Sequence, residues 1–378
     1  MSGKHDAGIP METAGLQPVD IRAPRFFWLL QPWREGKLVT IDGWGRFAEI
    51  SFRGANRIEI KQLVDFPRAK MDRQLITWPE AGLITSSTAE RMHHLAAIDD
   101  KKTKSHIPLL TWRHIISAPV LLDPVEGLVG YCYSMRGNNI STTLLVYNYK
   151  EDKIVYESPE DFTISFRIAM NERYSLCGKR ILNGRNIEAI RILYDWRTNE
   201  IIENDLTEAI NRNGISLIIR PDRNIHLGKR ILFGYSNILK KEVKITWNEE
   251  YSDINVTPLD YLVPRENRFD DFILSADGTW GATFISGYRG IYDERLYKRA
   301  FFHLDDRYPN GISMPVITED FEDYQWDYSA FVKHPVHGMC FAQEWHKDRH
   351  QYLRLYKMDA VLEEINRQLL EAASEIAR

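Results

Sequence analysis

Short runs of alternating apolar and polar residues, separated by turn signals, occupy most of the chain and predict β-strands. Alternation is the pattern of a half-buried strand, whereas a helix repeats its apolar positions every three to four residues. The apolar run Phe162–Ala169, for example, is followed by the turn pair Asn171-Glu172 and then by another apolar run. No helical period separates these runs, so the pattern predicts an all-β protein rather than a parallel α/β fold.

One arrangement of strands recurs, and its two clearest copies lie about fifty residues apart. The segment Tyr174–Leu182 (YSLCGKRIL) precedes an alternating run at 188–195, and the segment Ile225–Asn237 (IHLGKRILFGYSN) precedes another at 242–247. In this alignment Lys179-Arg180 and Lys229-Arg230 occupy matching places. A repeated salt bridge between neighbouring repeats is therefore the expected role of these basic pairs.

Weaker copies of the same order occur elsewhere in the chain. They pair residues 83–87 with 94–98, 128–134 with 142–149, 280–286 with 296–303, and 340–345 with 352–356. Short apolar runs at 162–169, 215–220, 271–275 and 329–333 precede copies, and further strands at 153–156 and 200–203 follow two of them. Each unit is thus predicted to be a four-stranded antiparallel meander.

A four-stranded sheet repeated about every 40 to 55 residues is typical of propeller blades. In strand order and period the chain resembles a WD40-like β-propeller over residues 26–357, although it lacks the Gly-His and Trp-Asp dipeptides of true WD repeats at the blade positions. The resemblance implies the fold alone. Third-strand landmarks at Ile50, Ala97, Tyr147, Tyr194, Thr246, Phe302 and Tyr356 favour seven blades, and six or eight stay open.

The two ends of the chain differ from the repeats. Residues 1–25 are polar and are predicted to form a flexible N-terminal arm. Phe26–Leu30 is either the first strand of the first blade or the strand that completes the last one. Residues 358–378 place apolar side chains along one side at helical spacing and predict a C-terminal amphipathic α-helix. That helix either packs on the propeller or binds a partner.

Composition and charge narrow the class of protein. The chain is 44% hydrophobic and 27% charged, with 10 Trp, 18 Tyr and 16 Phe, which suits a large β-rich core. A net charge of −4 gives no electrostatic reason to expect nucleic acid or a membrane as partner. Three widely spaced cysteines favour a reducing compartment, and no apolar run suggests a leader, so a cytoplasmic location is expected.

One short stretch holds five potential metal ligands: His334, His337, Cys340, His346 and His350. The strand predicted at 339–345 would separate the first two histidines from the last two by roughly 20 Å, too far for one coordination sphere. We therefore predict no metal site, with the pair His346 and His350 as the weaker alternative.

Other catalytic motifs are absent from the sequence. It contains no G-x-S-x-G nucleophile elbow and no G-x-x-x-x-G-K-[ST] phosphate loop. Paired carboxylates of a glycosidase would come from separate blades, and Asp270, Asp271 and Asp327 beside first strands are the candidates. A hydrolase or lyase acting on a glycan in the central funnel stays an alternative, but no catalytic residue and no cofactor is predicted.

The connections between second and third strands should project on one side of the propeller, together with the segments that enter each first strand. We call this side the loop-rich face; its connections include 136–139, 183–186, 234–237, 287–292 and 347–349. Turn geometry accounts for their Gly and Asn, whereas Arg and Tyr are enriched at interfaces. The predicted anchors are Arg136, Arg185, Tyr235, Tyr288, Arg289 and Tyr292. The predicted function is therefore a non-catalytic binding or scaffold propeller that recognises a protein or peptide, with the oligomeric state open.

Overall fold

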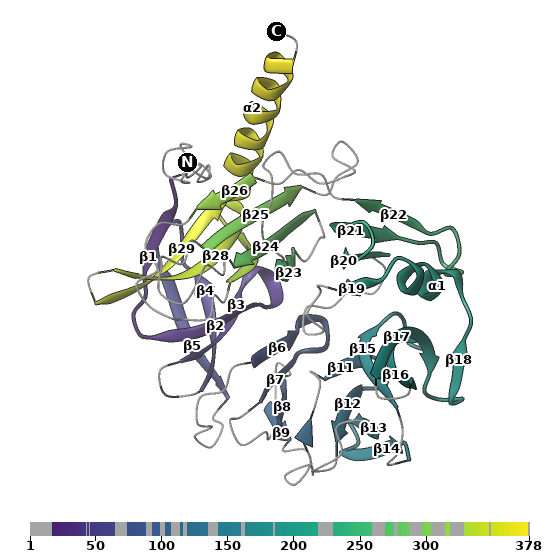
Figure 1. The fold of residues 1–378 in the computed structure, drawn as a ribbon. Helices are drawn as coiled ribbons and strands as arrows, with labels where there is room; N and C mark the ends of the chain where they lie inside the picture. Colours follow the sequence, from purple (N-terminus) through teal and green to yellow (C-terminus); the bar gives the residue numbers. More distant parts are fainter. Residues whose placement is uncertain are drawn as a thin grey trace. The chain divides into compact units, whose positions relative to one another are not determined.

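The computed structural model consists mainly of antiparallel strands (Figure 1). It describes residues 17–42, 44, 46–64, 74–87, 93–98, 103–106, 114–115, 119–134, 143–159, 163–183, 186–217, 230–258, 269–275, 279–286, 297–303, 314–317, 329–347 and 349–376. The chain divides into two compact units. Unit 1 is Met1–Gly43, Ala48–Lys61 and Pro258–Arg378, and unit 2 is Trp44–Phe47 and Gln62–Thr257.

Among the described residues, unit 1 contains three four-stranded sheets, except that Phe47 of β4 and residues 62–64 of β5 fall in unit 2. One is β2 (Phe27–Pro32), β3 (Leu38–Asp42), β4 (Phe47–Phe52) and β5 (Ile58–Val64). Another is β23 (Phe269–Leu274), β24 (Trp280–Ser286), β25 (Tyr297–His303) and β26 (Met314–Ile317). The last is β27 (Ser329–His334), β28 (Gly338–Lys347) and β29 (His350–Lys357), with β1 (Val19–Arg22) as its outer strand.

Unit 2 contains four sheets of the same plan. The first is β6 (Gln74–Trp78), β7 (Leu83–Ser87), β8 (His93–Ile98) and β9 (Thr103–His106), and the second is β10 (His114–Ile115), β11 (Val120–Asp123), β12 (Leu128–Ser134), β13 (Thr143–Asn148) and β14 (Lys153–Glu157). The third is β15 (Ile164–Ala169), β16 (Ser175–Asn183), β17 (Asn186–Asp195) and β18 (Glu200–Ile202). The fourth is β19 (Ile215–Leu217), β20 (Ile231–Ser236), β21 (Lys241–Thr246) and β22 (Asn255–Pro258). In the second of these, β10 and β11 both pair with β12, so its first strand is broken in two.

The predicted meander is confirmed. Every third-strand landmark of the sequence lies in the third strand of a sheet, from Ile50 in β4 to Tyr356 in β29. The chain is an all-β propeller built from four-stranded antiparallel blades.

The helices are few in the part of the chain that the structure describes. The C-terminal helix is α2 (Met358–Ile376), whose first turn buries Met358 and Val361 against the cluster around Phe341. Figure 1 shows α2 leaving the end of β29. The helix α1 (Asp205–Arg212) was not anticipated, and Asn204 caps it by accepting a hydrogen bond from the backbone N–H of Thr207. Two 3-10 turns, η1 (Arg34–Gly36) and η2 (Pro79–Ala81), complete the set.

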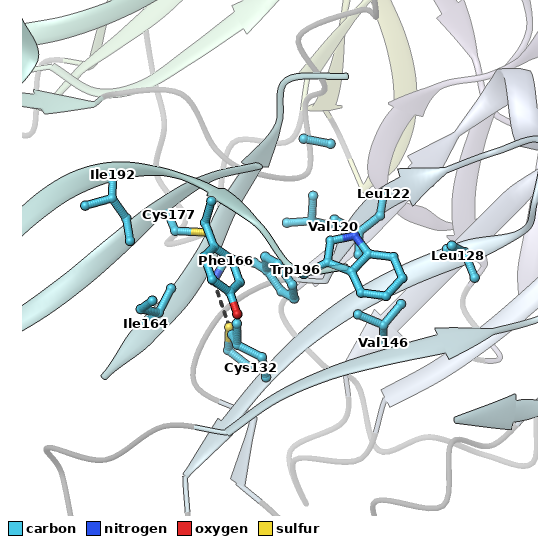
Figure 2. Close-up of a cluster of buried hydrophobic side chains, with 13 residues drawn as sticks. Val120, Leu122, Leu128, Cys132, Val146, Ile164, Phe166, Cys177, Ile192 and Trp196 are labelled. Carbon is cyan, nitrogen blue, oxygen red and sulfur yellow. Dashed lines mark hydrogen bonds between the residues drawn. The ribbon is translucent and has the colours of Figure 1, made fainter. Parts of the chain in front are cut away.

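Neighbouring sheets bury apolar side chains against each other. Figure 2 shows one such cluster, in which Leu122 and Cys132 of the β10–β14 sheet meet Phe166 and Cys177 of the β15–β18 sheet. The backbone N–H of Phe166 donates to Sγ of Cys132. All three cysteines are buried thiols, and burial raises the pKa of Cys340 to about 12. They are packing groups of the core, as expected for inert thiols.

The N-terminal strand corrects the predicted arm. Residues 19–22 belong to β1, which pairs along its whole length with β29 and completes the last sheet. Ile21 is buried, and Asp20 accepts two hydrogen bonds of 2.7 Å from the guanidinium of Arg354. Phe26–Leu30 is therefore not the completing strand, because β2 begins at Phe27 and is the first strand of its own sheet. Only Ile21 of the four side chains of β1 is buried, so the sequence of this short segment does not distinguish a strand from an arm.

A second correction concerns the basic pairs. Arg180 lies inside β16, opposite Ala189, whereas Arg230 precedes the start of β20. Cross-strand pairing instead makes Gly178 equivalent to Gly234. The third-strand landmarks Tyr194 and Thr246 pair with Ser175 and Ile231, and each glycine lies three residues after that partner. Arg230 forms an ion pair with Glu249 of its own sheet, not with a neighbouring one. The shared letters GKRIL therefore mark similar composition, not equivalent positions.

In three of the described sheets the first turn, between the first and second strands, is closed by one polar side chain. Oδ1 of Asp123 accepts hydrogen bonds of 2.8 and 2.9 Å from the N–H groups of Val125 and Glu126. Asn171 does the same for Arg173 and Tyr174. Such side-chain acceptors replace backbone partners in tight turns.

These first turns also bind the third turn of the following sheet. Arg197 of the β17–β18 turn donates to Asp123 at 3.3 Å and to Glu126 at 3.0 Å. Nδ2 of Asn171 donates to the hydroxyl of Tyr251 at 2.8 Å, in the β21–β22 connection. Neighbouring sheets of unit 2 are thus joined at their turns as well as by their apolar cores.

In unit 1 the side chain that closes the first turn of the β27–β29 sheet is a histidine. Nδ1 of His334 accepts hydrogen bonds of 3.1 Å from the N–H groups of Val336 and His337. His337 in turn donates through Nε2 to the carbonyl oxygen of Ala55, in the β4–β5 turn, at 3.2 Å. The His334 ring also packs edge-on against Phe52. Burial, together with the neighbouring His337, lowers the pKa of His334 to about 4.

Deletion of residues 1–22 removes β1, whereas deletion of residues 1–16 leaves it intact. We expect the longer deletion to lower the free energy of unfolding by about 3 kcal/mol, because it uncovers the surface beneath Ile21 and unpairs Arg354. Thermal unfolding followed by circular dichroism compares the two proteins. Equal midpoints would contradict the role given to β1.

The lowered pKa of His334 predicts that the free energy of unfolding depends on pH. A base whose pKa is lowered by folding stabilises the native state above its unfolded value near 6.5, and this contribution is lost as pH falls towards 4. We expect a loss on the order of 2 kcal/mol across that window. His334→Asn should flatten the dependence, since Asn171 shows that an amide oxygen closes this turn. His350→Asn, which removes an exposed imidazole, should keep the wild-type slope in urea unfolding at pH 7, 5.5 and 4.5.

Candidate binding face

Antiparallel pairing places the second turn of each sheet at the end opposite its first and third turns. The β16–β17 register closes at Asn183 and Asn186, and the β20–β21 register at Ser236 and Lys241. The β28–β29 register closes at Lys347 and His350. These ends, with the segments that enter first strands, make up the loop-rich face within each unit.

Of the predicted anchors, one lies in the described residues. Tyr235 belongs to β20, opposite Ser216 and Glu242, and is half-buried. It is therefore a strand residue rather than the loop residue that was predicted, because the turn begins only at Asn237. The others, Arg136, Arg185, Tyr288, Arg289 and Tyr292, lie outside the described residues.

The turn after β20 carries two apolar side chains that the prediction missed. Ile238 is 64% exposed and Leu239 is 42% exposed. The turn ends on Lys240, which has a left-handed φ of 55°. The signal was visible in the sequence as two adjacent aliphatic residues in a turn, where polar residues are usual.

Hydrogen bonds hold this turn in one conformation. The buried Ser236 Oγ donates to the carbonyl oxygen of Asn213 at 2.9 Å and accepts from the N–H of Leu239 at 3.1 Å. Asn237 donates to the carbonyl oxygen of Gly214 through its backbone N–H at 3.2 Å and through Nδ2 at 2.9 Å. Residues 213 and 214 directly follow α1, so the C-terminal end of this helix is hydrogen-bonded to the β20–β21 turn.

In unit 1, at the loop-rich end of β29, the side chain of Gln351 links this strand to the backbone of β2. Its Oε1 accepts from the N–H of Phe27 at 2.8 Å, and its Nε2 donates to the carbonyl oxygen of Phe27 at 2.5 Å. One buried amide thus pairs with the backbone of β2 as a strand would. Arg22 donates to the ring of His350 at 3.1 Å, and Phe26, which precedes Phe27 in the chain, is exposed.

The histidine cluster is split by β28 as predicted. His334 and His337 lie at the first turn, and His346 and His350 lie at the second. Within the described ranges no group of three or more His, Cys, Asp or Glu side chains is placed to hold a metal ion. The side chains of Asp270 and Asp271 and the whole of Asp327 lie outside those ranges, so the glycosidase alternative rests on unplaced residues.

Across the elements that the structure describes, no helix is long and apolar enough to cross a membrane.

Comparisons with known proteins show similarity of fold. No family model matches the chain, and no curated protein matches it. Solved structures that it resembles include the β-propeller domain of Cps50 (Swd1) from Myceliophteria thermophila, with 12% identity, 89% of this chain and 98% of that chain covered, and a TM-score of 0.49. The β-propeller domain of the Trilobed protease from Pyrococcus furiosus has 8% identity, with 88% and 96% covered and a TM-score of 0.46.

A prolyl endopeptidase is also similar, with 13% identity, 93% of this chain and 49% of that chain covered, and a TM-score of 0.44. The chain spans about half the length of that peptidase.

The support beneath the β20–β21 turn can be tested by stability. Ser236→Ala should lower the free energy of unfolding by about 1 to 3 kcal/mol, because it removes a buried hydroxyl and leaves the Asn213 carbonyl and the Leu239 N–H without their partner. Ile238→Ser changes an exposed side chain of the same turn and should stay within about 0.5 kcal/mol of wild type. Urea unfolding of both variants makes the comparison, and an unchanged Ser236→Ala protein would refute the anchoring.

Proposed function

We propose that this chain is a non-catalytic binding or scaffold propeller that recognises a protein or peptide through its loop-rich face. The observation that carries the proposal is the rigid β20–β21 turn, which presents Ile238 and Leu239 to solvent. Exposed aliphatic side chains on a preorganised turn favour binding, because little conformational entropy is lost when a partner covers them. The tyrosines and arginines predicted on neighbouring connections would extend the same surface.

We further infer that the seven sheets of the described strands are the seven blades of one propeller. The loop-rich ends of the blades would then lie on a common side. A partner could therefore contact several second turns together, which suits a protein or extended peptide better than a small molecule. The cytoplasmic location expected from the free cysteines is consistent with this role and stays a proposal.

The proposal is tested with a partner isolated by pull-down from native lysate and then purified. Ile238→Ser and Leu239→Ser should each weaken binding by about 2 kcal/mol in calorimetry, since central apolar anchors dominate interface energies. Stability should be unaffected, because both side chains are exposed.

Val125→Ser is the matched control. Val125 is 78% exposed and lies in the β11–β12 turn, at the end of its sheet away from the loop-rich face. It removes similar apolar surface and should leave binding unchanged. Equal losses from Val125→Ser and Ile238→Ser, or a loss from Val125→Ser alone, would overturn the assignment of the face.

A further inference from the structure

Two arginines meet over a glycine in the β15–β18 sheet. Arg167 lies in β15, Arg191 in β17, and Gly178 in β16 between them. A Cβ atom at Gly178 would lie 3.1 Å from Nη1 of Arg191 and 3.5 Å from Nε of Arg167. The missing side chain therefore provides the space in which both guanidinium groups lie.

Strand register makes this a shared face of the sheet. Gly178 is directly opposite Ser165 on one side and Arg191 on the other, so their side-chain positions point the same way. Ser165 is buried, and its Oγ would lie 3.3 Å from a Cβ at Gly178. We call Ser165, Arg167, Gly178 and Arg191 the arginine cradle.

Among the residues that the structure describes, the positive charge of the cradle has no paired carboxylate. Both arginines are half-buried, and the Nε atom of each is buried without a hydrogen-bond partner. Within the described residues no carboxylate forms an ion pair with either guanidinium. Other arginines of the chain behave differently: Arg173 is paired with Asp195 at 2.8 Å, and Arg354 with Asp20 at 2.7 Å.

Such an arrangement is costly unless an anion joins it. Burial, and then the nearby charge of Arg167, lower the pKa of Arg191. Removing a cation from water without a compensating partner is strongly unfavourable, and a second cation beside it adds repulsion. Guanidinium groups are suited to relieve this cost by donating paired hydrogen bonds to the oxygens of phosphate or carboxylate.

The backbone beneath the cradle is held in place. The amide of Asn211, in α1, accepts from the N–H of Arg191 and donates to its carbonyl oxygen, both at 2.8 Å. β18 pairs only with residues 193–195 of β17, so this side chain substitutes for a strand neighbour at Arg191. The backbone from which the Arg191 side chain extends is thus held at both its N–H and its carbonyl group.

We propose that the arginine cradle binds an oxyanion of phosphate size, carried by a small molecule. The anion would accept hydrogen bonds from Arg167 and Arg191 over Gly178, with the hydroxyl of Ser165 as a third donor. This ligand site lies on the sheet itself, and its existence does not depend on protein recognition at the loop-rich face. The bound oxyanion is either inorganic phosphate or the phosphate group of an organic ester.

The test uses the full chain in oxyanion-free chloride buffer at constant ionic strength. Inorganic phosphate and glycerol 3-phosphate are titrated separately, and binding is measured by calorimetry and by the rise in melting temperature. Saturable stabilisation by either probe supports the site, and the tighter probe identifies the source. A melting temperature that follows ionic strength alone, with no saturable heat, would overturn the proposal.

Variants locate the binding. Arg167→Met and Arg191→Met should each weaken phosphate binding at least about tenfold, the loss of one charged hydrogen bond. In chloride buffer neither should melt lower than wild type, because each removes an uncompensated charge. Gly178→Ala keeps both charges while filling the cradle, and it should weaken binding several-fold.

Arg212→Met is the matched control, since it removes the same charge from an exposed position on α1. It should bind phosphate like wild type. If it loses as much affinity as Arg191→Met, or if Arg167→Met and Gly178→Ala both bind normally, the anion does not lie in the cradle.

Discussion

In three of the sheets, the closing of the first turn by one side-chain acceptor is the interaction that positions the contact with the next sheet. Asp123, Asn171 and His334 each satisfy two backbone N–H groups, which fixes the turn that follows. The fixed turn then presents a group to the third turn of the next sheet, as Asn171 does to Tyr251. A four-stranded sheet cannot cover its own faces, so the geometry of these links decides how the apolar faces meet.

The second turns lie at the opposite end of each sheet from the first and third turns, and they are supported in different ways in different sheets. At the first turns of three sheets, Asp123, Asn171 and His334 are hydrogen-bonded to the backbone, and residues of these turns are hydrogen-bonded to the third turn of the next sheet. At the second turns the supports differ from sheet to sheet: α1 and Ser236 hold one turn, and Gln351 holds the strand entry in unit 1. A surface whose supports vary while its scaffold repeats is where specific recognition would be expected.

The β15–β18 sheet shows that the two faces of one sheet need not serve the same purpose. Phe166 and Cys177 face the β10–β14 sheet and are dry packing groups (Figure 2). The opposite side-chain set places Arg167 and Arg191 over Gly178. Alternation along β16 and β17 places Gly178 and Arg191 on the opposite side from Cys177 and Ile192, whereas Arg167 is the extra residue where the register of β15 shifts between Phe166 and Ile168.

The sequence alone determined the fold class and the strand order, because alternation and turn signals are local properties that short segments carry by themselves. It also located the C-terminal helix and the split of the histidines by one strand. What only the tertiary structure decided is register and partnership. Whether residues 19–22 form a loose end or a strand depends on β29, which lies more than 300 residues away in the chain. That Gly178 is equivalent to Gly234 rather than to the glycine of the shared GKRIL follows from cross-strand pairing. The convergence of Arg167 and Arg191 has no spacing signature, because non-adjacent strands bring them together across a residue that has no side chain.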